Sequence, residues 1–93
     1  MSGVTPADVR IFLKNYLGQK VEEKQRKTLE DLPDDCDLLL SGVIKDSIDF
    51  LDLLVAIQEY AGREIDFDIL DPEEMSIVGP LCRFVSEQTS KTN

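Results

Sequence analysis

The feature that most constrains the fold is a segment of helical periodicity between Asp46 and Gly62. Its apolar residues recur at the spacing of one helix face, which carries Phe50, Leu53, Leu54, Ile57, Tyr60 and Ala61. Asp46 or Ser47 suits the N-cap, and Gly62 suits the residue just beyond the last turn. The pattern therefore predicts an amphipathic helix with its main apolar face in a core.

A second, narrower apolar stripe follows the same segment and consists of Ile48, Leu51 and Val55. Around it lie three acidic residues, Asp49, Asp52 and Glu59. A helix of a small domain needs only one apolar face to be buried. The stripe therefore has two interpretations: another part of the chain covers it, or another protein does.

Two further helices are predicted near the ends of the chain. Thr5-Pro6-Ala7-Asp8 combines an N-cap, a proline in the first turn and an acid three residues after the cap, and helically spaced apolar residues follow. Gly18 can end this helix, or residues 21–24 can extend it by a turn. Ser76 suits the N-cap of a last helix, in which Pro80 lies in the first turn.

The connections between these helices differ in length. Residues 19–41 are charged and then rich in turn residues, which predicts a long loop with Leu38, Leu39 and Leu40 as apolar anchors. Its basic cluster at residues 24–27 is interpreted as a solvated surface. Residues 63–70 form a loop or a short helical turn, and residues 71–75 form another turn of helix.

The chain is thus expected to be all-α, with three main helices, one short helix and a long loop between the first and second helices. Its 93 residues suffice for one domain with one core, ordered over about residues 5–86. Residues 1–4 are expected to be loose, and the polar tail from Ser86 to Asn93 is expected to fray.

Composition excludes several classes of function. The 19 acidic and 10 basic residues give a net charge of −9, which opposes binding to nucleic acid and favours partners with basic surfaces. No apolar run approaches the ~20 residues of a membrane span, and the N-terminus lacks a signal pattern, so we expect a cytoplasmic protein. We also expect it to be a monomer. Two cysteines, Cys36 and Cys82, are expected to be free thiols.

The chain also lacks the usual groups of a catalytic centre. It has no histidine, the commonest general base and metal ligand. The acidic segments 34–37 and 66–68 lack the ligand spacing of a calcium-binding loop, so no metal is expected. We therefore do not expect an independent hydrolase or metalloenzyme.

Ser47 is the side chain with the clearest chemical potential. As a nucleophile it is poorly placed, because Asp46 and Asp49 disfavour an alkoxide and no histidine can act as its base. As an attachment point it is well placed, because a phosphate on a serine at a helix N-terminus faces the positive end of the helix dipole. The simpler interpretation is that Ser47 only caps the helix.

The sequence Asp46-Ser47-Ile48-Asp49, at the start of an acidic amphipathic helix and after a long loop, resembles the acyl carrier protein family. The resemblance covers about residues 5–85. It implies a four-helix bundle in which Ser47 carries 4′-phosphopantetheine, whose thiol holds acyl or aminoacyl groups as thioesters. Val43-Ile44-Lys45 before the motif and Ile48 within it depart from the usual pattern of fatty acid carriers. The sequence Ser41-Gly42-Val43-Ile44, followed closely by Asp46-Ser47, looks closer to stand-alone carriers of specialised pathways, including peptidyl-type and D-alanyl-type carriers.

The resemblance also implies partners. These are a phosphopantetheinyl transferase, an acyl- or aminoacyl-activating ligase, and a ketosynthase or another acyl-transferring enzyme of fatty acid, polyketide or nonribosomal peptide biosynthesis. They would dock on the side of the helix formed by Ile48, Leu51, Asp52, Val55 and Glu59. The alternative hypothesis is an unmodified helical protein–protein interaction module. The sequence leaves the cargo open.

Overall fold

The structure is a computed structural model, and it describes residues 4–90 of the chain. The expected all-α fold is confirmed, and the part described contains no strand beyond an isolated bridge between Asp37 and Ile77. The elements in chain order are α1 (Pro6–Gly18), α2 (Glu23–Asp31), α3 (Ser47–Ala61), a 3₁₀ turn η1 (Phe67–Ile69), α4 (Pro72–Met75) and α5 (Val78–Ser90).

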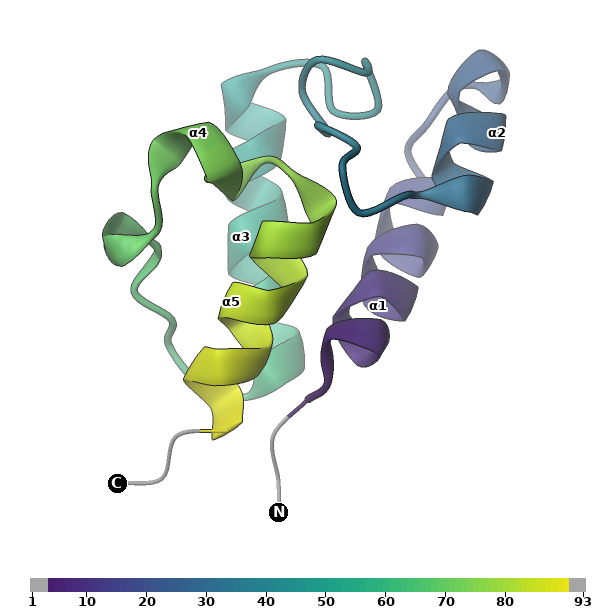
Figure 1. Ribbon diagram of the computed structural model, residues 1–93. Helices are drawn as coiled ribbons and strands as arrows, with labels where there is room; N and C mark the ends of the chain where they lie inside the picture. The colour runs from purple at the N-terminus through teal and green to yellow at the C-terminus, as the bar shows by residue number, and fades with distance from the viewer. Residues whose placement is uncertain (1–3, 91–93) are drawn as a thin grey trace.

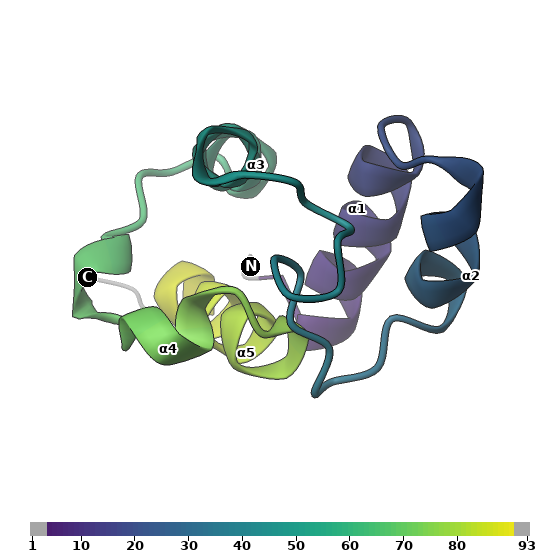
Figure 2. The ribbon, with the colours of Figure 1, turned by 90° about the horizontal axis from the view of Figure 1, so that it is seen from above.

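Three main helices surround a common interior. Seen from above, α1, α3 and α5 lie around it, while α2 lies on the outer side of α1 (Figure 2). Each main helix turns an apolar face inwards, and the fully buried side chains include Val9, Leu13, Leu53, Ile57, Leu81 and Val85. The short helix α4 and the turn η1 connect α3 to α5, as expected for residues 63–75 (Figure 1).

The helix α2 corrects the expected long loop between the first two main helices. Of its nine residues only Leu29 is buried, so the segment has no apolar stripe from which a helix could be predicted. Its Glu, Lys, Gln and Arg residues are nevertheless good helix formers, and Leu29 anchors them to the core. The basic cluster at residues 24–27 lies on this helix and is mostly exposed.

Residues 32–46 form the remaining connection and are attached to the start of α5. Leu38 N–H donates to the Ser76 carbonyl at 2.8 Å, and Val78 N–H donates to the Cys36 carbonyl at 2.9 Å. Ser76 was expected to cap the last helix, but that helix begins at Val78, and the Ser76 hydroxyl donates instead to Asp37 Oδ1 at 2.9 Å.

Several apolar residues are placed differently from the sequence prediction. Only Leu38 of the three consecutive leucines is an anchor, because Leu39 is 36% and Leu40 87% exposed. Tyr60 was expected in the core but is 42% exposed, and its ring stacks on Phe12 with centroids 4.5 Å apart. Cys36 and Cys82 are free and buried, as expected for a chain without a disulfide.

The two ends of the described chain are tied together. Val4 N–H donates to Thr89 Oγ1 at 3.0 Å, and Thr89 is buried. Val4 is therefore held against the core rather than loose, and α5 continues through Ser86 instead of fraying there. The rest of the expected loose end, residues 1–3, lies outside the described residues, as do residues 91–93.

Candidate functional site

The candidate site is the N-terminus of α3. Asp46 is the N-cap, and its Oδ1 accepts a hydrogen bond from Asp49 N–H at 2.9 Å. Ser47 is consequently the first residue of the helix rather than its cap, and it is exposed. The N–H groups of Ser47 and Ile48 precede the first bond within the helix, which Phe50 N–H makes to the Asp46 carbonyl.

The segment just before Ser47 is fixed by burial. Val43 is 6% and Ile44 3% exposed, and Ile44 N–H donates to the Leu38 carbonyl at 2.9 Å. Gly42 has φ +84°, a conformation that favours glycine and lets the chain turn towards α3. The backbone is thus anchored in the core three residues before the exposed serine.

The helix α3 has two faces of opposite character. Phe50, Leu53, Leu54 and Ile57 are buried, as the main apolar face predicts. The second stripe is exposed: Ile48 by 70%, Leu51 by 59% and Val55 by 52%. The interpretation that another part of the chain covers this stripe is therefore wrong for the described residues.

The acidic residues of the predicted docking face share this exposed side. Asp52 and Glu59 are exposed, as is Asp49 of the motif. Positions 48, 52, 55 and 59 alternate spacings of four and three residues, which keeps them on one side of the helix. Ile48, Asp52, Val55 and Glu59 thus share one accessible side of α3, and Ser47 is exposed in its first turn.

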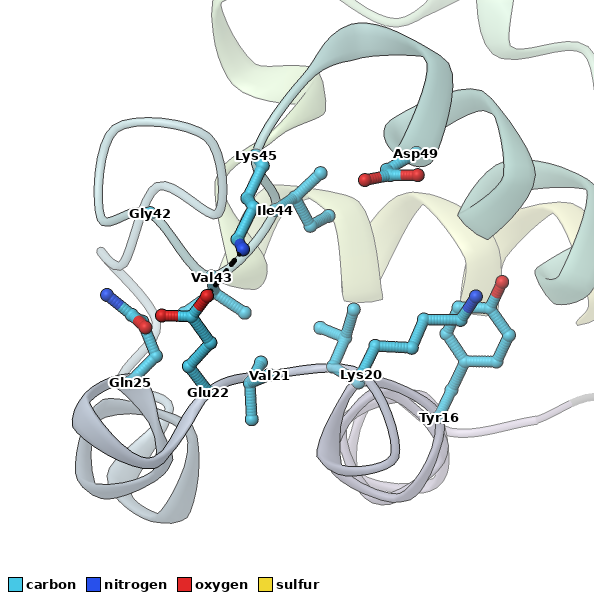
Figure 3. A pocket seen from close by; sticks show the side chains of 11 residues that line it. Tyr16, Lys20, Val21, Glu22, Gln25, Gly42, Val43, Ile44, Lys45 and Asp49 are labelled. Atoms are coloured by element: carbon cyan, nitrogen blue, oxygen red, sulfur yellow. Dashed lines mark hydrogen bonds and ion pairs between the residues drawn. The ribbon is translucent and has the colours of Figure 1, made fainter.

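A pocket of about 340 Å³ lies beside this site (Figure 3). Its walls come from the end of α1, the start of α2, residues 42–45 and the first turn of α3, and its apolar lining consists of Leu17, Val21, Val43 and Ile44. Its polar lining includes Lys20, whose Nζ lies 5.1 Å from the centre of the Tyr16 ring. Sequence reasoning missed this pocket because two separate stretches of the chain, residues 16–25 and 42–49, form it.

Lys45, for which the sequence predicted no role, has a partner in this pocket. Its Nζ donates to Glu22 Oε2 at 2.7 Å, across 23 residues of sequence. This hydrogen bond and the opposite charge raise the pKa of the Lys45 ammonium and lower the pKa of the Glu22 carboxyl. The pair joins the N-cap residue of α2 to the segment that leads into α3.

The chain has no histidine, and one carboxylate oxygen of Asp46 accepts the capping bond from Asp49 N–H. Within residues 4–90 no three side chains of the metal-binding types gather into a possible site. Nor does any described helix have the length and apolar character to cross a membrane. Ser47 is thus an exposed hydroxyl on the first turn of a helix.

Comparison of the chain with protein-family models, with curated protein sequences and with solved structures finds no match in any of the three. The function is accordingly argued from the site itself.

Proposed function

We propose that this protein is an acyl carrier whose Ser47 bears 4′-phosphopantetheine through a phosphodiester to its Oγ. The observation that carries the proposal is the position of Ser47, exposed on the first turn of α3 and next to an exposed apolar stripe. A carrier performs no turnover alone. It presents a thioester on a flexible arm to the enzymes that load and use it.

The local electrostatics support a phosphate at this position. The helix α3 has 15 residues, and its positive dipole end and the N–H groups of Ser47 and Ile48 lie at the attachment point. The chain has no histidine, the commonest general base. We expect the transferase to supply the base that takes the serine proton.

The exposed side of α3 supports docking of partner enzymes. The exposed apolar stripe of Ile48, Leu51 and Val55 can supply the buried contact area at the centre of an interface. Asp52 and Glu59, together with a net charge of −9, would steer partners with basic surfaces towards this side. The expected partners are a phosphopantetheinyl transferase, an activating ligase and acyl-transferring enzymes such as a ketosynthase.

The exposed stripe also supports the second candidate function, an unmodified interaction module. Both proposals predict that partners bind α3 through Leu51 and its neighbours. They differ at Ser47, because only a carrier needs a hydroxyl there. A test of covalent modification at this one residue therefore separates them.

The test is co-expression with a broad-specificity phosphopantetheinyl transferase, followed by measurement of the intact mass. We expect a gain equal to one phosphopantetheine group, lost in Ser47→Ala and retained in Ser41→Ala. Both serines are exposed and precede or begin α3, so the second variant is a matched control. An unchanged mass with a transferase shown to be active on another carrier would refute the carrier proposal.

A further inference from the structure

We propose that Lys45 couples modification of Ser47 to the position of α2: in the modified protein its ammonium leaves Glu22 for the phosphate on Ser47, which releases the start of α2 from the segment that enters α3. This inference rests on the proposed function, since it requires a phosphodiester on Ser47. It gives partner enzymes a difference between the unmodified and the modified protein that lies outside the arm.

The first argument is that Lys45 can reach a phosphate on Ser47. Only Asp46 separates the two residues, and its backbone is extended, with φ −150° and ψ 174°. The Cα atoms of Lys45 and Ser47 are therefore no more than about 7 Å apart, a distance that a lysine side chain and a phosphate together span. The Lys45 side chain is 63% exposed, so no packing prevents its four-carbon stem from turning between the two acceptors.

The second argument is the charge around the Lys45 ammonium. Figure 3 shows its bond to Glu22 and, on the first turn of α3, the carboxylate of Asp49. Asp49 helps to raise the pKa of Lys45, so the ammonium already interacts with the first turn of α3. A phosphodiester on Ser47 adds a second negative charge there, and its oxygens are strong acceptors of charge-assisted hydrogen bonds. Glu22 keeps another cation, Lys24, which also lowers its pKa.

The third argument is that the existing ion pair is easily exchanged. The side chains of Lys45 and Glu22 are both more than half exposed, so water and dissolved salt screen the attraction between them. The phosphate is tethered two residues from Lys45, and its charge repels the Glu22 carboxylate. Modification therefore offers the ammonium a new partner and weakens its interaction with the old one.

The consequence falls on α2, which has few other attachments. Leu29 is the only buried residue of this helix, and its N-cap residue Glu22 makes no capping bond with its side chain. Within residues 4–90, the bond between Lys45 and Glu22 is the one side-chain hydrogen bond that joins residues 19–31 to residues 42–47. Loss of this bond lets the first turns of α2 open more often, which speeds the exchange of their amide hydrogens with water.

The main experiment measures the pKa of the Glu22 carboxyl by NMR in the unmodified protein and in the protein carrying the arm, after the intact mass has shown that the arm is attached. The Glu22 pKa, which Lys45 lowers in the unmodified protein, should rise towards 4.5 on modification. In Lys45→Ala, modification should leave the Glu22 pKa unchanged.

Two results would overturn the inference. One is a Glu22 pKa that does not change when the wild type is modified. The other is an equal rise in the wild type and in Lys45→Ala, because the phosphate would then act on Glu22 directly and not through Lys45. Failure to attach any arm would instead overturn the proposed function first.

Hydrogen exchange gives a second readout with matched variants. In the unmodified protein, Lys45→Ala should speed amide exchange at residues 26–31 by about two- to fivefold, as modification does in the wild type. Lys20→Ala is the control, because Lys20 also lines the pocket but belongs to neither ion pair of the described residues, and it should exchange like the wild type. Equal exchange in the modified and unmodified wild type, each shown to be folded by its thermal transition, would overturn the inference.

Discussion

Two leucine-to-alanine substitutions on α3 test the separation of its two faces. Leu54 is 7% exposed and packs in the core, whereas Leu51, three residues earlier, is 59% exposed. The chemical change is identical at both positions, and both lie in the interior of the same helix. Any difference in outcome therefore reflects the surroundings of the side chain and not helix propensity.

The expected magnitudes follow from burial. Leu54→Ala should lower the free energy of unfolding by about 2–5 kcal/mol, because the lost transfer energy and the cavity add. In a domain of this size, a loss of about 3 kcal/mol lowers Tm by roughly 12–24 °C. Leu51→Ala should change the free energy of unfolding by no more than about 0.5 kcal/mol, since its side chain is mostly in water.

The rate of modification by the transferase should respond in the opposite way. If Leu51 is part of the docking surface, its truncation removes about 1 kcal/mol of contact with the enzyme and lowers kcat/KM roughly fivefold. Leu54→Ala should leave kcat/KM nearly unchanged at 25 °C, because a domain of about 5 kcal/mol that loses 3 is still largely folded.

The assays are urea unfolding followed by circular dichroism and initial rates of mass gain for each variant. The reasoning is refuted if Leu51→Ala destabilises the fold as much as Leu54→Ala does, because the stripe would then be internal. It is also refuted if Leu51→Ala is modified at the wild-type rate, because the stripe would then have no part in docking to this enzyme.

Three further predictions concern other parts of the molecule. Gly79→Ala should destabilise the fold by about 1–3 kcal/mol in urea unfolding, because a Cβ there would lie 3.0 Å from the Asp34 carbonyl oxygen, whereas Gly18→Ala, with 3.6 Å of clearance, should not. The pKa of the Glu22 carboxyl, followed by NMR, should lie below 4.5, and the Lys45→Ala variant should return the Glu22 pKa towards 4.5. Because the folded pKa is lower than the unfolded one, the stabilisation from Glu22 is present above the unfolded pKa and is lost as the pH falls through the folded pKa. Burial raises the pKa of the Cys82 thiol from 9.0 to about 11. The stabilisation from the neutral thiol should therefore be lost as the pH rises between these values. A Cys82→Ser variant should show a smaller decline in the free energy of unfolding over the same pH range.

The parts of the fold that were predictable from the sequence depend on local signals. The capping box of Thr5 and Asp8 and the cap of Asp46 on Asp49 each involve residues three positions apart. The two faces of α3 likewise follow from helical periodicity alone, and the exposed stripe was predicted as one of two alternatives. Tyr60 departs from its face because stacking on Phe12 holds its ring at the edge of the core.

The parts that were missed depend on contacts between distant residues. The helix α2 is stabilised by a single apolar anchor, Leu29, which no periodicity could reveal. The Lys45 partner, Glu22, lies in a segment expected to be a loop. The Ser76 hydroxyl donates a hydrogen bond to Asp37, 39 residues earlier in the chain, instead of capping α5. The pocket beside the start of α3 forms only when residues 16–25 and 42–49 are brought together, so it could not be found from the sequence.

The bond between Val4 and Thr89 has a practical consequence for experiments on this protein. Both ends of the described chain lie at the same end of the bundle as the last turn of α3, while the start of α3 lies at the opposite end (Figure 1). Ser47 is the first residue of that helix. A fluorophore, affinity handle or surface tether joined near either end would thus be held away from the serine by the length of that helix. Immobilised protein should therefore present Ser47 outwards, and a dye pair on Ser47 and a chain end would report the opening of the bundle.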